Sequence, residues 1–391
     1  MTDVQDTPRA SLALLRRITD RHVVDQLLRT DGLTRAEIAA TTGISKPTVS
    51  ESVRRLEQDG VVASAGAAPS GRRGPAGVHY RLRPDLGVAL AVVGGPDGLV
   101  AELLDVRGTL LRRVERATPS PVTAAALEPL LVALVTEATT DVPGPVRACA
   151  LSLAGPVDRG TGRLVHLPHS PFLVDELDPC ALLAPLLDAA EGVEAVDVEV
   201  DNDVNWAALA EHGTGVAAGL DDFCYLHLGH GLGGAVVQGG HLVRGHAGLA
   251  GEPAHVLTTG PDGRALRLGE CFGALGLQRP GSDTIDVDAV VHVLAGRSAE
   301  DRRRGDAVVV AVAGVLASVA ALLNPAAVVV GGPCAGAPGF VDRLAAQTEG
   351  LLVPPTPVLP ATLGPGAPLL GARVAALRSL HARLFDHAAT G

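Results

Sequence analysis

Two helix-start signals separated by a glycine turn constrain the first part of the chain more than any other feature. Thr34 can cap a short helix, and Glu37, three residues later, completes a capping box. A turn at Gly43 follows, and Ser45, with Pro47 just inside, starts the next helix. Apolar residues recur at helical spacing, so that the two helices can pack together: Ile38, Ile44, Val49, Val53 and Leu56. This order predicts a helix-turn-helix whose second helix is free to enter the major groove of DNA.

The flanking segments extend this pattern. A helix is predicted over residues 11–29, where these apolar residues share one face: Leu12, Leu15, Ile18, Val23, Val24, Leu27 and Leu28. Two short strands, at 61–62 and 79–82, flank the loop 70–75 and predict a wing. Arg72 and Arg73 lie between glycines at its tip, which suits a phosphate or a narrow minor groove. The alternatives are a solvated loop between domains and a purely structural helical hairpin.

Charge is divided unevenly along the chain. Residues 1–83 hold 13 Lys and Arg against 9 Asp and Glu, whereas the other 308 residues hold 19 against 34. A basic module of this kind meets the electrostatic requirement for binding a phosphate backbone. We therefore predict that residues 1–83 form a winged helix-turn-helix domain that binds double-stranded operator DNA. Its predicted contact residues are polar and lie at the two caps, along the second helix and at the wing: Thr34, Ser45, Lys46, Thr48, Ser50, Ser52, Arg54, Arg72 and Arg73.

Residues 84–391 have a different texture, with short Val, Leu and Ala runs alternating with glycine turns and longer helices. This alternation predicts α/β layers. Strands are expected at 86–93, 99–105, 109–114, 146–153, 196–200, 223–228, 235–237 and 327–330. Helices are expected at 123–139, 205–212, 307–323 and 369–387. This acidic body is the second predicted domain.

Composition excludes several classes of protein. Aromatic residues make up 2% of the 391 residues, which argues against stacking platforms for single-stranded nucleic acid. The five cysteines lack CxxC spacing, which is typical of a reducing compartment and predicts a cytoplasmic protein. The charged start of the chain does not match a secretory signal. The apolar run 307–323 is rich in Ala and Gly, and we interpret it as a buried core helix rather than a membrane span.

Two motifs in the body carry specific information. In Val200-Asp201-Asn202-Asp203-Val204-Asn205-Trp206, a strand delivers polar residues to the head of a helix. Residues 228–237 are predicted to form a glycine-rich hairpin. After it comes the stretch Arg244-Gly245-His246-Ala247-Gly248-Leu249-Ala250-Gly251-Glu252-Pro253-Ala254-His255. At these residues the chain resembles the ROK family (repressors, open reading frames, kinases), as do its stretches 152–158 and 323–332. The resemblance implies an actin-like (ribonuclease H-like) two-lobed sugar-kinase fold. A winged helix fused to this fold is typical of the family's transcriptional repressors.

The resemblance also implies a sugar site. Asn and carboxylate groups suit neighbouring sugar hydroxyls, because a missing hydroxyl would leave a buried polar group unpaired. Asp203 matches the family's catalytic base, although an Asp at a strand end can also be a helix cap. The implied ligand-binding residues lie in the motifs quoted above: Gly155, Asn202, Asp203, Glu252 and His255.

Kinase activity is predicted to be lost. A kinase of this fold needs an Asp-x-Gly-x-Thr turn after its opening strand, which orients the metal and the nucleotide phosphates. The aligned stretch 86–97 lacks the acid and the hydroxyl at that spacing. The second phosphate loop keeps its glycines but carries His230 where the family usually has Thr. We therefore expect no catalytic residue and no enzyme activity.

The structural zinc site of the family is also expected to be absent. Of its ligand positions, His255 and Cys271 are present, whereas Arg264 and Leu266 replace the other two. Two ligands do not make a closed tetrahedral site, so we predict no zinc and no other cofactor. The family's Glu two residues after the last Cys is Gly273 here, which weakens that wall of the sugar pocket.

Three functional hypotheses follow. The first is a cytoplasmic repressor of sugar-metabolism genes that responds to a sugar or sugar phosphate, as a homodimer or homotetramer, since helix-turn-helix proteins usually read two half-sites. The second is an ATP-dependent sugar kinase with an accessory domain. The third is a ligand-independent regulator whose body serves for oligomerisation. No membrane association is expected.

Overall fold

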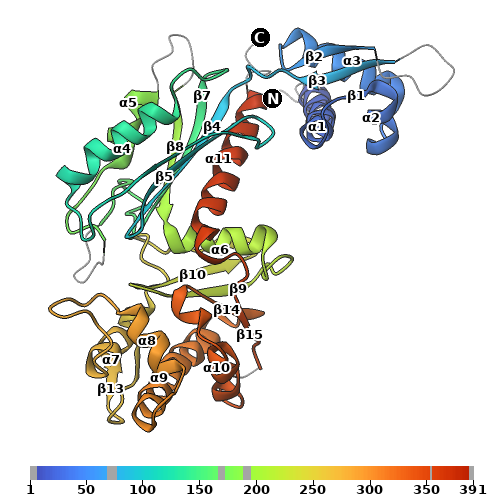
Figure 1. Cartoon of the computed structure of the whole chain (residues 1–391). Helices are drawn as coiled ribbons and strands as arrows, with labels where there is room; N and C mark the ends of the chain where they lie inside the picture. Colours follow the sequence, from blue (N-terminus) through green and yellow to red (C-terminus); the bar gives the residue numbers. More distant parts are fainter. Residues whose placement is uncertain (1–6, 68–76, 166–171, 188–194, 353–354, 387–391) are drawn as a thin grey trace, which may run out of the picture.

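The computed structural model describes residues 7–67, 77–165, 172–187, 195–352 and 355–386. The chain begins with a winged-helix domain, which lies beside one end of a two-lobed body (Figure 1). This domain contains α1 (Thr7–Arg29), β1 (Leu33–Thr34), α2 (Arg35–Thr42), α3 (Lys46–Gln58), β2 (Val62–Ala67) and β3 (Val78–Leu82). Its strands form an antiparallel sheet in the order β1-β3-β2.

The local signals of the helix-turn-helix are confirmed. Thr34 caps α2 and forms a capping box with Glu37, and Ser45 caps α3. Gly43 adopts the left-handed conformation that reverses the chain between the helices. The domain core is apolar and fully buried, with Val23, Val24, Leu27, Ile38, Val49, Val53 and Leu56 in contact. Leu15 and Ile18 were predicted to face this core but are 56% and 44% exposed, so the part of α1 that packs on the core begins further along, at Val23, Val24 and Leu27.

The first lobe of the body is a five-stranded mixed sheet in the order β6-β5-β4-β7-β8. Its strands are β4 (Val88–Gly95), β5 (Gly98–Leu104), β6 (Leu110–Arg116), β7 (Val146–Leu153) and β8 (Asp197–Asn202). Large residues of β4, such as Leu90, face α4 (Ala124–Ala138) and α5 (Pro179–Leu187). Small residues of the same strand, Ala89 and Ala91, face α11 (Ala367–Asp386), so that this helix packs closely on the other side of the sheet.

The second lobe is built on a sheet in the order β11-β10-β9-β14-β15. Its strands are β9 (Phe223–Leu228), β10 (Leu232–Gln238), β11 (His241–Leu242), β14 (Ala327–Gly331) and β15 (Val358–Pro360), with a separate hairpin of β12 (Leu257–Thr259) and β13 (Ala265–Arg267). Its helices are α6 (Asp203–Thr214) on one face and α7 (Leu268–Ala274), α8 (Val287–Leu294), α9 (Ala299–Leu323) and α10 (Phe340–Thr348) on the other. Of the described helices, α9 alone is long and apolar enough to span a membrane, and its buried side chains belong to the core of this lobe.

Helices α6 and α11 cross where the lobes meet (Figure 1). The single Trp, Trp206 of α6, is fully buried there and donates its indole N–H to the carbonyl of Leu151 at 3.2 Å. A Cβ atom placed on Gly371 of α11 would lie 2.0 Å from the backbone oxygen of Trp206, so only glycine allows this approach. Every strand and helix predicted for the body is present, β7 and β9 with the predicted ends and the others with at least one end shifted. Helices α5, α7, α8 and α10 and the short strands β11, β12, β13 and β15 were not predicted.

Candidate functional site

The outer face of α3 presents four of the nine predicted DNA contacts. Lys46 and Thr48 are exposed in its first turn, and Ser50 is half-buried beside them. Arg54 is exposed further along, where its guanidinium donates to Glu51 at 2.6 and 3.1 Å and to Gln58 at 3.1 Å. These positions form one polar surface on a helix whose opposite side is buried, which is the arrangement that groove reading requires.

Thr34 and Ser45, the two predicted contacts at helix caps, stabilise the starts of α2 and α3. The hydroxyl of Thr34 donates to Glu37 at 2.8 Å, and this pairing holds the pKa of Glu37 below its usual value, chiefly through the backbone N–H of Thr34. Ser45 accepts from the N–H of Thr48 at 3.4 Å. Arg72 and Arg73 lie outside the described residues.

Ser52 was predicted as a DNA contact, and this prediction is wrong. Its side chain is fully buried between α1 and α3 and donates to Asp20, which also accepts from Arg55 at 2.7 Å. The physical reason is helical spacing, because a residue three positions after the buried Val49 lies on the inner face of α3. Ser52 therefore fixes α3 to α1.

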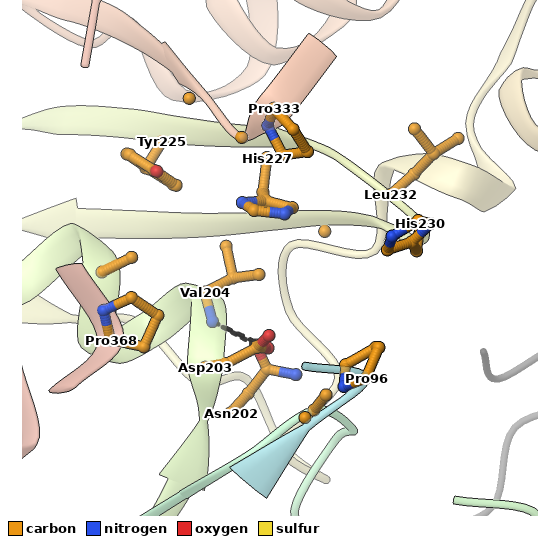
Figure 2. Close-up of a pocket in the computed structure, with 18 of the residues that line it drawn as sticks. Pro96, Asn202, Asp203, Val204, Tyr225, His227, His230, Leu232, Pro333 and Pro368 are labelled. Carbon is orange, nitrogen blue, oxygen red and sulfur yellow. Dashed lines mark hydrogen bonds between the residues drawn. The ribbon is translucent and has the colours of Figure 1, made fainter. Parts of the chain in front are cut away.

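A cleft of about 1130 Å³ lies between the two lobes. Residues from the end of β4, the start of α6, the β9–β10 hairpin and the start of α11 line it (Figure 2). The structure brings all the predicted ligand-binding residues to this one cleft, although they are spread over a hundred positions: Gly155, Asn202, Asp203, Glu252 and His255.

The end of β8 delivers the central pair. Asn202 is the N-cap of α6, and its side-chain oxygen accepts from the N–H of Val204 at 2.7 Å. Asp203 is therefore the first residue of the helix rather than its cap, and its carboxylate lies in the cleft (Figure 2). Burial raises the pKa of Asp203 to about 6, against an opposing effect of the Val204 N–H.

A buried ion pair between Asp201 and Arg244 stabilises the end of β8. Asp201 accepts from Arg244 at 2.6 Å and from the side-chain amide of Asn205 at 2.7 Å. Arg244 also pairs with Glu199 at 3.7 Å. Since Asp201 is 2% exposed, its charge needs these partners, and they fix the position of Asn202 beside it.

Glu252 is another buried carboxyl of the cleft, with a raised pKa like that of Asp203. Burial, and then the nearby charge of Asp203, raise the pKa of Glu252 to about 7. The two carboxyls can therefore hold protons near neutral pH and donate as well as accept hydrogen bonds. Such a pair can match the alternating donors and acceptors of a polyol.

The two remaining residues of the zinc segment lie in different surroundings. Cys271 is fully buried in the second-lobe core, whereas His255 is exposed at the cleft. Within the described ranges, no three His, Cys, Asp or Glu side chains lie together as metal ligands would. The residues present do not fit a structural zinc ion, and its absence remains a prediction.

Several cleft residues were not predicted from the sequence. Gln278 fills the space beside Gly273, its side-chain oxygen 2.7 Å from where a Cβ of that residue would lie. Tyr225 and His227 also line the cleft. The sequence signal that could have found them is the alternation of side chains in β9. Cys224, Leu226 and Leu228 face the core of the second lobe, so the residues between them face the opposite side of the sheet.

Comparisons with known proteins agree with this architecture. The ROK family profile matches residues 89–273, and a winged helix-turn-helix DNA-binding profile matches residues 16–63. The bifunctional enzyme NanE/NanK of Brucella melitensis is 29% identical over 75% of this chain, and the chain covers 54% of that protein, about half its length. The xylose repressor of Bacillus subtilis is 24% identical over 63% of this chain and 62% of its own length. Proteins named as glucokinases also match.

One solved structure resembles nearly the whole chain. A ROK family transcriptional regulator, described as a homolog of the E. coli MLC protein, aligns with a TM-score of 0.66 over 96% of this chain and all of its own, at 17% identity. At that identity the likeness concerns the fold. Relatives of the body thus include both kinases and repressors. The chain therefore joins an N-terminal winged helix-turn-helix domain to a ROK family domain.

Proposed function

We propose that this protein is a cytoplasmic transcriptional repressor that binds operator DNA through α3 and the wing and responds to a sugar bound between the lobes. The observation that carries the proposal is the combination of two surfaces in one chain. The outer face of α3 is polar and free, and the five implied sugar-binding residues line one cleft. The names of the repressor relatives support the same function.

Specificity in the cleft would come from hydroxyl recognition. The amide of Asn202 and the carboxyls of Asp203 and Glu252 would pair with neighbouring hydroxyls of a sugar ring. A ligand that lacks one of these hydroxyls would leave a buried polar group unpaired, which costs roughly 1–3 kcal/mol. The cleft would thereby select a sugar without transforming it.

The route from the cleft to the winged-helix domain follows α11. Its first residues, including Pro368, line the cleft, and near its other end His381 makes a 2.7 Å hydrogen bond with the carbonyl of Val106 in the β5–β6 turn. In the same turn, Arg107 donates to Asp31 of the winged-helix domain at 2.6 Å. A movement of the lobes that displaced α11 would therefore reach the base of the DNA-binding domain. Two copies within a homodimer or homotetramer would read two half-sites.

DNA binding is tested on α3. A fragment enriched from random-sequence DNA by the wild-type protein serves as the probe. Lys46→Ala and Arg54→Ala should each weaken binding to it by roughly tenfold or more, because each removes a cation from the groove-facing surface. Arg264→Ala, an exposed arginine on the β12–β13 hairpin, is the matched control and should bind as the wild type does. Unchanged affinity and salt dependence in both α3 variants would contradict the assigned surface.

We further propose that the protein is not a kinase and holds no zinc. With ATP, magnesium and a panel of hexoses, the purified protein should release no ADP above background, because the stretch 86–97 lacks the acid and the hydroxyl at the spacing that positions metal and phosphate. Phosphorylation of any hexose in the panel would overturn the first statement. Stoichiometric zinc in elemental analysis would overturn the second.

A further inference from the structure

The cleft has room for more than one sugar ring. Pockets for drug-sized ligands usually measure about 300–1,000 Å³, and this cleft, at about 1130 Å³, is slightly larger than that range. The polar residues discussed above lie around the start of α6. Six of the other lining residues are grouped here as the second-lobe subsite: His227, His230, Leu232, Pro333, Pro365 and Pro368. Figure 2 shows Pro333 beside His227, across the cleft from Asn202 and Asp203.

Three of the six positions that define this subsite have no backbone N–H. Phosphate groups are usually held by backbone N–H groups of glycine loops and helix N-termini. Here Pro333 follows the glycines of β14, and Pro365 and Pro368 stand just before and inside the first turn of α11, so these positions have no N–H. The N–H of Ala367 is bonded to Gly364. In the glycine hairpin, the N–H of Gly229 is bonded to Gly231 at 3.0 Å.

The charges of the whole cleft also disfavour an anion. Its described lining contains two arginines, Arg113 and Arg267, against five acidic residues: Asp97, Asp203, Glu252, Glu270 and Asp283. Arg113 is already bonded to Glu102 and Glu115, each at 2.6 Å. Burial, and then the nearby His230, lower the pKa of His227 to about 4, so its ring is neutral at neutral pH. A phosphate in this cleft would therefore meet more acidic side chains than arginines, and the neutral ring of His227.

What the subsite does offer is apolar surface. The rings of Pro333, Pro365 and Pro368 and the side chain of Leu232 provide carbon atoms for contact. The two histidines add one donor or acceptor per ring nitrogen. This lining suits a substituent that is flat or apolar and carries few polar groups.

We propose that the second-lobe subsite binds an uncharged, largely apolar substituent, so that the effector is a neutral glycoside whose sugar lies at Asn202 and Asp203 and whose aglycone lies against Pro333 and Pro368. The inference rests on the proposed function, because it assigns the ligand class of that cleft. It excludes sugar phosphates and nucleotides as effectors.

The test is isothermal titration calorimetry on the full chain with matched ligands. Each sugar of a panel (glucose, mannose, xylose, N-acetylglucosamine) is compared with its 4-nitrophenyl glycosides and, for the hexoses, with its 6-phosphate. At least one nitrophenyl glycoside should bind tenfold or more tightly than its parent sugar, the 6-phosphates should bind at least tenfold more weakly, and ATP should not bind. Tighter binding of a phosphate, or no gain from the aglycone for any sugar, would overturn the inference.

A substitution in the second-lobe subsite tests whether the aglycone binds there. Gly336, in the turn after Pro333, lines the cleft, and a Cβ there would meet no atom within 4 Å. Gly336→Phe should therefore fill the subsite and abolish the gain from the aglycone while the parent sugar binds as before. Gly213→Phe is the matched control, since Gly213 is exposed on α6, outside the cleft lining, with the same free space. A gain that persists in Gly336→Phe would place the aglycone elsewhere.

Operator binding, measured on the same preparations, distinguishes a failure of the proposed ligand class from a failure of the proposed repressor function. If DNA binding is found and no aglycone gain appears, the ligand class is wrong while the DNA-binding function stands. If glycosides bind as expected and no DNA is bound, the ligand class stands and the repressor function is wrong.

Discussion

Single residues of the candidate site divide into those that motifs reveal and those that only packing reveals. Asn202, Asp203 and Glu252 stand in recognisable stretches of sequence, and the structure brings them to one cleft. Gln278 could not be found in this way, because its role depends on the space that Gly273 leaves beside it. Ser52 shows the opposite error, since its residue type suggested a DNA contact while its helical position already indicated burial.

The two raised carboxyl pKa values predict a pH dependence of stability. Asp203 and Glu252 have pKa values of about 6 and 7 in the folded protein, above those of the unfolded chain. Their protonated forms are therefore favoured by folding, and this contribution is complete below about pH 4 and lost as the pH rises through 6 to 7. Each group should lower the free energy of unfolding by about 1 to 3 kcal/mol as the pH rises across this range.

Chemical denaturation between pH 4 and 8 measures the effect. Asp203→Asn and Glu252→Gln should each flatten the decline of the unfolding free energy across this range. Glu128→Gln, at an exposed position of α4, should leave the slope as it is in the wild type. A slope unaffected by both cleft variants would mean that the carboxyls are charged in the folded protein at pH 5.

Elements that carry their own signals were predicted, and those defined by contacts were not. The long strands of the two sheets and helices α4, α6, α9 and α11 show apolar runs or caps in the sequence. The three-residue β15 pairs with β14 and has no pattern of its own, since period-two alternation needs more residues than it has. The early turns of α1 were assigned to the core from periodicity alone, which does not indicate where the neighbouring helices end.

The crossing of α6 and α11 makes a prediction at the level of elements. Gly371→Ala would force the Trp206 backbone and α11 apart, because the new Cβ would lie 2.6 Å from the Trp206 carbonyl carbon and closer still to its oxygen. Overpacking of this kind typically costs about 1–3 kcal/mol, which should appear as a lower denaturation midpoint. Gly213→Ala, on the exposed side of α6, should not lower it. A Gly371→Ala protein as stable as the wild type would show that the two helices can separate freely.

At the scale of the whole molecule, the winged-helix domain is joined to the body partly by exposed polar contacts. One is the ion pair between Arg107 and Asp31, whose carboxylate side chain is 90% exposed. Exposed pairs of this kind are typically worth up to about 1 kcal/mol, so this pair adds little to the apolar contacts that also join the domain to the body. A small energy of ligand binding is enough to break such a pair.

Reversing the charge of this pair tests the joint. Arg107→Glu should separate the turn from the winged-helix domain, so that amide hydrogen exchange at residues 30–33 rises several-fold and small-angle scattering reports a longer molecule. Arg264→Glu makes the same change of charge on the second lobe and should leave both measurements unchanged. An identical scattering profile for Arg107→Glu would show that other contacts hold the domain.

The buried indole at the helix crossing has a practical consequence for the whole protein. Because Trp206 is the only tryptophan in 391 residues, light emitted after excitation at the red edge of tyrosine absorption comes from one point. That point lies one helical turn from Asp203 and against the backbone of Gly371. The unlabelled protein thus contains a built-in optical probe of the hinge between its halves, and its emission colour can be followed while candidate effectors are added.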